Sequence, residues 1–140
     1  MGYVQGELGK KIQELMDESF HQYKQEKYDE AIQLLADAWE ALPDGKNEYD
    51  ESYLIVWRIL DIAVKTHKID IMNQWVDKIF YADLERMDTG ERELWAGKVA
   101  YESGDLKKAK EYIKVANKKS HGRCFDEGEE KYRELLTQEL

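Results

Sequence analysis

Cysteine and proline are almost absent from this chain, which has one residue of each among 140. A single cysteine excludes an internal disulfide framework, and so little proline suits a chain that is helical throughout. Long hydrophobic runs are missing as well, because the longest, Leu54 to Trp57, is far too short to span a membrane. The N-terminal segment MGYVQGELGKKIQEL lacks the apolar core of a secretory signal. These absences predict a cytoplasmic protein.

Positive charge is also scarce: 21 Lys and Arg residues face 30 Asp and Glu, and the net charge is −9. Such a chain repels nucleic acid over most of its surface, so a nucleic-acid partner is not expected. The exception is the segment 105–123, where seven basic and two acidic residues leave +5 locally and −14 for the rest of the chain. This segment is either the solvated face of an outer helix or a patch for an acidic partner or the acidic tail.

Enough apolar residues remain to build a core. Hydrophobic residues make up 42% of the chain and aromatic residues 11%, which excludes a disordered chain. A chain of this length corresponds to one domain, residues 1–140. The helical spacing of the apolar residues predicts an all-α protein, with helices at about 7–24, 28–42, 51–66, 69–86, 91–102 and 106–119 and a last one from about 127.

Two of these helices have recognisable borders, and one has a distinctive composition. Asp88 or Thr89 is expected to cap the fifth helix, and Asp105 the sixth, because their side chains can accept bonds from the first helical N–H groups. The third helix is apolar almost all round. It is therefore expected at the centre of the domain.

The chain contains a repeat. The segments YDEAIQLLADAWEALP and GDLKKAKEYIKVAN superpose when Ala31 is aligned with Ala109, and Leu35 then matches Ile113. A second alanine follows seven residues after the first, at Ala38 and Ala116. Residues seven apart lie on one helical face, where small side chains let a neighbouring helix approach closely. A repeat of this kind predicts a stack of helical hairpins.

With the residues upstream, the two copies resemble tetratricopeptide repeats. In the C-terminal copy the family's small residue, aromatic, turn glycine and two alanines correspond to Gly97, Tyr101, Gly104, Ala109 and Ala116, and His121 replaces the expected proline. In the N-terminal copy the corresponding residues are Ser19, Tyr23, Glu26, Ala31, Ala38 and Pro43. A weaker middle copy has Met72 and Ile79 at the alanine positions, which predicts looser packing or another helix angle there.

The resemblance covers about residues 13–121 and implies a right-handed solenoid of three hairpins, at about 7–43, 50–86 and 90–120. Residues 123–140 would then form a capping tail. Tyr132, Leu135 and Leu136 are expected to cover the open end of the stack, as end repeats require.

No catalytic or metal site is apparent. The three histidines, His21, His67 and His121, fall in different hairpins without metal-ligand spacing. Cys124 follows Arg123, which could lower the pKa of its thiol, but no base is near in sequence. The chain is therefore expected to be noncatalytic and to carry no cofactor. An enzyme built on helical hairpins is the alternative from another class.

In tetratricopeptide stacks the first helix of each hairpin lines a concave groove that binds protein segments. Carried over, the resemblance places partner-binding residues at Phe20, Tyr23, Trp57, Asp61, Lys98 and Tyr101, with Met16, Val64 and Leu94 beside them. The large apolar members could equally belong to the core, so the polar Asp61 and Lys98 are the better indication of an open surface. Met16 and Phe20 replace the basic and Asn residues of chaperone-binding members, so a clamp for a C-terminal carboxylate is not expected.

A second resemblance concerns the segment SHGRCFDEGEEKY. It is similar to the endings of small bacterial helical-repeat proteins found beside polymorphic toxins, although Gly128 stands where an acidic-proline turn would be more typical. This resemblance implies an immunity protein whose acidic surface blocks a basic toxin domain. The alternative among binding proteins is a scaffold or regulatory adaptor that recognises a peptide in its groove.

Overall fold

The computed structural model describes residues 2–82 and 88–140 and is all-helical over these ranges, with no strand beyond an isolated bridge between Gly2 and Tyr49. The helices are α1 (Gly6–Lys24), α2 (Tyr28–Ala41), α3 (Asp50–Lys65), α4 (Ile69–Ala82), α5 (Glu91–Glu102), α6 (Leu106–Ser120) and α7 (Glu130–Glu134). In the same ranges two short 3₁₀ helices, Lys46–Glu48 and Leu135–Thr137, accompany them. None of the described helices is long and apolar enough to cross a membrane.

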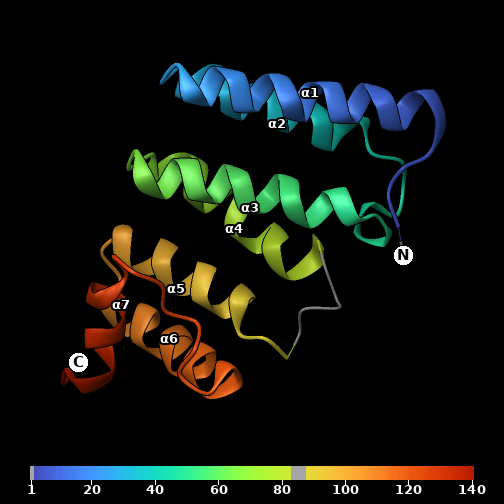
Figure 1. Ribbon diagram of the computed structural model, residues 1–140. Helices are drawn as coiled ribbons and strands as arrows, with labels where there is room; N and C mark the ends of the chain where they lie inside the picture. Colours follow the sequence, from blue (N-terminus) through green and yellow to red (C-terminus); the bar gives the residue numbers. More distant parts are fainter. Residues whose placement is uncertain (1, 83–87) are drawn as a thin grey trace.

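The first six helices form three antiparallel pairs, α1 with α2, α3 with α4, and α5 with α6 (Figure 1). The same turn closes each pair. Glu26, His67 and Gly104 have positive φ angles of 61°, 57° and 91°. The next residue in each turn, Lys27, Lys68 or Asp105, donates its N–H to a carbonyl five residues back, at 2.8–2.9 Å. This bond satisfies a carbonyl that the ending helix leaves open, so all three copies, the middle one included, share a local structure.

The alanine positions of the repeat lie where the helices of a pair meet. Ala31, Ala38, Ala109 and Ala116 are fully buried, and so are Met72 and Ile79 in the middle copy. Gly97 of α5 lies directly against α6, because a Cβ built on it would lie 2.7 Å from Ile113 Cδ1. In the first pair, the buried Ser19 hydroxyl donates to the Ala31 carbonyl at 2.7 Å. Small residues therefore set the close approach of α5 to α6, and a short side-chain bond joins α1 to α2.

The third helix is central, as its composition predicts. α3 packs on α4 within its own hairpin and on α2 and α5 to either side. Nine of its residues are buried, among them Ile55, Val56, Ile59 and Leu60, which have no exposed surface. One continuous apolar core runs from α1 to Trp95 and Val99 of α5, and a second, smaller one joins α5, α6 and the tail.

Several predicted borders shift. The fourth helix is described to Ala82, and its expected end at Arg86 lies outside the described residues. Gly90, in a left-handed conformation, takes the N-cap position of α5, although Thr89 Oγ1 accepts a bond from the Glu91 N–H at 3.3 Å. The N-cap at Asp105 is confirmed, since its side chain accepts a bond from the Lys108 N–H at 3.1 Å.

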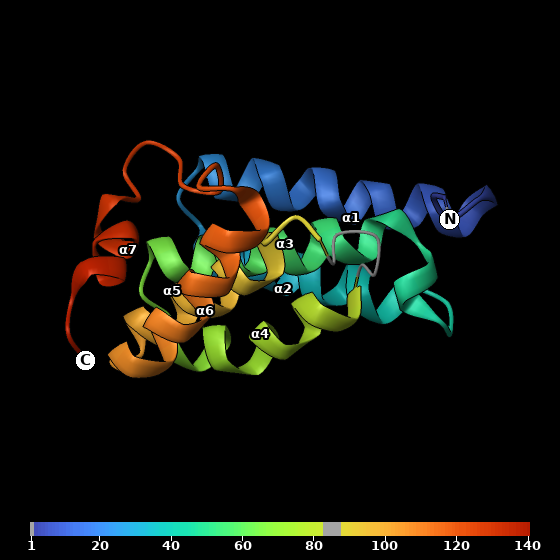
Figure 2. The ribbon, with the colours of Figure 1, turned by 90° about the horizontal axis from the view of Figure 1, so that it is seen from below.

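The tail closes the last hairpin, as expected, but its helix is short. α7 begins at Glu130 rather than near 127, because the residues before it form a turn through Gly128 with φ of 88°. Tyr132 is 3% exposed and Leu135 has no exposed surface, while Leu136 is only partly buried. Figure 2 shows α7 at the end of the molecule opposite the N-terminus, beside α5 and α6.

Candidate functional site

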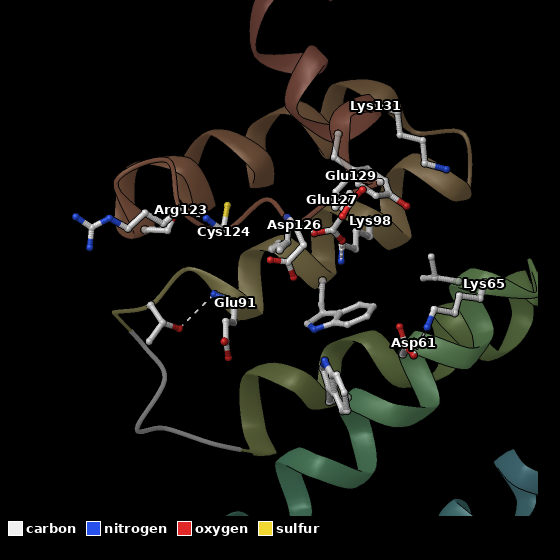
Figure 3. A pocket seen from close by; sticks show the side chains of 18 of the residues that line it. Asp61, Lys65, Glu91, Lys98, Arg123, Cys124, Asp126, Glu127, Glu129 and Lys131 are labelled. Atoms are coloured by element: carbon white, nitrogen blue, oxygen red, sulfur yellow. Dashed lines mark hydrogen bonds and ion pairs between the residues drawn. The ribbon is translucent and has the colours of Figure 1, made fainter. Parts of the chain in front are cut away.

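A groove of about 1260 Å³ opens between α3, α5 and the segment that follows α6 (Figure 3). One stripe of α3 lines it with Tyr53, Leu54, Trp57, Asp61 and Val64. A matching stripe of α5 lines it with Glu91, Leu94, Trp95, Lys98 and Glu102. The first helices of the second and third hairpins therefore form its floor, and residues 119–132 form the opposite wall.

Trp57 is the exposed aromatic of this groove. Its side chain is 37% exposed, whereas its neighbours Val56 and Ile59 are fully buried on the other face of α3. One turn further along, Asp61 accepts a hydrogen bond from Lys65 Nζ at 3.0 Å. That bond, together with the Asp61 charge, raises the pKa of Lys65. Trp57 thus presents an indole to the groove beside a carboxylate that already holds a cation.

Lys98 is not part of the open surface, contrary to the expectation from its polarity. It is 8% exposed, and its ammonium forms an ion pair with Glu129 of the tail (Figure 3). The ammonium also lies 4.3 Å from the centre of the Trp95 ring, a cation–π contact that stabilises the charge in a partly apolar setting. Lys98 therefore joins α5 to the tail and is already paired.

Glu102 makes the second link to the tail. Its Oε1 accepts bonds from Lys131 Nζ at 2.6 Å and from the Tyr132 hydroxyl at 2.8 Å, while His67 Nδ1 lies 3.6 Å from Oε2. Burial would raise the pKa of Glu102, but these two bonds and the charges of Lys131 and His67 outweigh it and hold the pKa below its usual value. Burial, and then the bond to Glu102, raise the pKa of the Tyr132 hydroxyl.

The structure brings together only part of the predicted site. Trp57, Asp61 and Lys98 line the groove, whereas Tyr101 packs edge-on against Tyr132 at 5.2 Å between ring centres.

The α1 residues lie outside the groove: Phe20 is 47% exposed beneath Lys24, and Tyr23 packs on Tyr28. Two of the neighbouring positions are buried, Met16 at 3% exposure and Leu94 at 6%, although Leu94 still reaches the groove.

Besides Glu102 and Glu129, three more acidic residues line the groove without having been predicted. Asp126 and Glu127 come from the tail and are exposed, and Glu91 begins α5, where its Oε2 accepts a bond from the Tyr53 hydroxyl at 2.9 Å. The sequence predicted a cap, and a possible contact with the basic segment 105–123, but not that the tail forms a wall of the groove. The available signal was its charge, since residues 124–140 carry six acidic and two basic residues.

The groove holds no recognisable catalytic or metal set in the part of the chain that the structure describes. No group of three or more His, Cys, Asp or Glu residues there is placed to hold a metal ion. Cys124 is partly buried at the groove wall, and its backbone N–H donates to the Ser120 hydroxyl at 3.1 Å. Its thiol packs with the smaller apolar core, which gives it a structural place.

Comparisons with protein-family models, with curated proteins and with solved structures found no match. The likeness to tetratricopeptide repeats therefore depends on the residues of this chain and on the turn that its three hairpins share.

Proposed function

We propose that this chain is a noncatalytic protein-binding module, a right-handed solenoid of three tetratricopeptide-like hairpins with a capping tail. The repeated turns at Glu26, His67 and Gly104 support the repeat. The observation that carries the function is the groove itself: a large hollow on the first helices, whose floor mixes apolar and charged side chains and exposes an indole. Exposed aromatics in sheltered hollows are typical anchors of protein interfaces.

The specific form of the proposal is a cytoplasmic immunity protein that blocks a basic toxin domain. Its support is the charge distribution, −14 outside the basic segment 105–123, and the likeness of the tail to those of immunity proteins. A surface of this charge attracts a basic partner over long range and speeds their encounter. The tail that carries the likeness also supplies Asp126 and Glu127 to the groove.

A scaffold or adaptor that recognises a peptide is the second candidate. The groove favours it because two parallel stripes, one on α3 and one on α5, form a floor that an extended or helical segment could follow. An adjacent toxin gene would favour immunity over an adaptor. An enzyme on this scaffold is the remaining alternative, and turnover of a captured partner would reveal it.

Site-specific cross-linking in the source cell tests the proposal. A photoreactive phenylalanine analogue at Trp57 is expected to capture one protein in high yield, and that protein should be basic. The control carries the analogue at Val115, which is 41% exposed on α6 and does not line the groove. Two outcomes would contradict groove binding. One is equal capture at both positions, and the other is no capture at Trp57 in cells where the unmodified protein binds a partner.

A further inference from the structure

We infer that the groove receives a basic segment of its protein partner, with an Arg or Lys side chain seated on Trp57 and facing Asp126 and Glu127. The inference rests on the proposed protein-binding function and adds the chemistry of the occupant. It also assigns the tail a role in recognition. Of the three groups that would hold the cation, Trp57 comes from α3, and Asp126 and Glu127 come from the tail.

The cations of the groove lining are mostly taken. Lys65 pairs with Asp61, Lys98 with Glu129 and Lys131 with Glu102. In each pair the negative charge of the acid offsets the positive charge of the lysine. These three lysines therefore oppose a basic occupant only weakly.

The acids of the tail turn are available. Asp126 and Glu127 are exposed, and within the described ranges no ion pair joins either carboxylate to a cation. The nearest basic residue in sequence is Arg123, and Figure 3 shows its side chain pointing away from both acids. The two carboxylates thus give one wall of the groove a negative charge, in the same hollow that the exposed Trp57 lines.

An indole beside carboxylates suits a guanidinium or an ammonium. The face of a tryptophan ring attracts a cation within about 6 Å, and a carboxylate can bind the same group from the side. Trp57 is the groove aromatic that is free for this, because the Trp95 ring already carries Lys98 and is 6% exposed. A neutral apolar segment would satisfy the indole but not the acidic wall.

The wall is held in place rather than free to swing away. The Asp126 N–H donates to Glu129 Oε1 at 2.9 Å, and the Glu129 N–H returns a bond to the Asp126 carbonyl at 3.1 Å, which closes the turn. Beyond the turn, the buried Tyr132 and Leu135 tie the tail to α5 and α6. The acids are therefore positioned before a partner arrives, which lowers the entropic cost of binding.

Selection from a phage-displayed library of random dodecapeptides tests this inference with a defined probe. Peptides enriched on the wild-type protein are expected to be rich in Arg and Lys. A synthetic copy of the most enriched peptide should bind the double variant Asp126→Lys/Glu127→Lys roughly tenfold more weakly, because the attraction at the wall becomes repulsion. Trp57→Ala should weaken binding by a similar factor, read beside a melting curve.

The control is Glu7→Lys/Glu14→Lys, which makes the same change in net charge at exposed positions of α1, outside the groove. It should leave the peptide affinity within about twofold of wild type at physiological salt, where charges that far from the groove are screened. Enriched peptides without an excess of Arg and Lys, no enrichment at all, or an equal loss in both double variants would overturn the inference. Protein capture at Trp57 would still stand in the first case, so the two proposals fail separately.

Discussion

Gly97 shows how one missing side chain decides the packing of a hairpin. A Cβ built there would lie 2.7 Å from Ile113 Cδ1 and 2.9 Å from Ile113 Cγ1, closer than side-chain carbons approach one another. To accept it, either the fully buried Ile113 side chain would have to leave its position or α5 and α6 would have to separate. The glycine at this repeat position thus serves close helix packing rather than backbone freedom.

Gly97→Leu is expected to lower the free energy of unfolding by about 2–3 kcal/mol, because the added side chain overfills the α5–α6 contact. Urea denaturation followed by circular dichroism measures the change. Lys114→Leu, at an exposed position of α6, is the matched control and should stay within about 0.5 kcal/mol of wild type. If the urea midpoint of Gly97→Leu equals that of wild type, α5 and α6 do not form the closely packed repeat hairpin assigned to them.

Glu102 makes stability depend on pH. Its pKa in the folded protein lies below the usual value, so the unfolded chain binds the proton more tightly than the folded one. The contribution of Glu102 to stability is therefore present above the unfolded pKa, near 4.5, and is lost as the pH falls through the lower folded value.

Glu102→Gln should reproduce this loss at neutral pH. The variant is expected to be less stable than wild type at pH 7, and the difference should shrink as the pH falls below about 4.5. Urea denaturation at several pH values checks it. If the difference in the free energy of unfolding between the two proteins stays constant down to acidic pH, the stabilisation by Lys131 and Tyr132 does not depend on the charge of Glu102.

At the scale of elements, the tail acts as both cap and wall. It covers the inner faces of α5 and α6 through Tyr132 and Leu135, and it also lines the groove. Tyr132 and Leu135 share the smaller apolar core with Ala109, Ile113 and Ala116 of α6. Leu106, by contrast, is 38% exposed, and Tyr112 packs on Phe80 of α4.

Leu135→Asp should detach the tail. Leu135 has no exposed surface, so a carboxylate there loses apolar burial and lacks a partner, which costs about 3 kcal/mol or more. Deletion of 126–140 should act more strongly and cause aggregation, because it removes Tyr132 and Leu135 from the smaller apolar core and exposes what they cover. Size-exclusion chromatography and melting curves measure both. Leu140→Asp, at a residue 47% exposed, is the control and should behave as wild type. A monomeric, equally stable deletion variant would make the tail a binding arm instead of a cap.

At the scale of the whole molecule, charge governs how a partner would arrive. The net charge of −9 combines a strongly acidic body with the basic segment on α6. Long-range attraction between this body and a basic partner acts over a Debye length, which shrinks from about 30 Å at 0.01 M salt to about 8 Å at 0.15 M.

The association rate with the captured partner is therefore expected to fall by roughly tenfold or more between those two salt concentrations, while the dissociation rate changes little. Stopped-flow tryptophan fluorescence measures both rates. Asp61→Lys should slow association further without lowering the melting temperature appreciably, since its only described ion pair is with the half-exposed Lys65. A rate that does not respond to salt would remove the electrostatic part of the proposed function.

Tyr101→Ala is less suitable as a binding variant, because Tyr101 packs on Tyr132.

The sequence by itself determined what depends on neighbours a few residues away. Apolar spacing placed every described helix within a few residues of its borders, and Asp105 marked a start by its side chain. The alanine pairs marked buried contact faces for the same reason, since residues seven apart share one side of a helix. The composition of the third helix predicted its central position, because an element that is apolar all round must be covered on several sides.

Only the tertiary structure decided which surfaces stay open. The return of the tail across α5 paired Lys98 with Glu129 and covered Tyr101 with Tyr132, and these contacts join residues about thirty apart. The same return brought Asp126 and Glu127 to the groove that α3 lines, while Phe20 and Tyr23 on α1 lie outside it. Helical periodicity says which face a residue is on, but the path of a loop between distant elements depends on contacts that no local pattern contains.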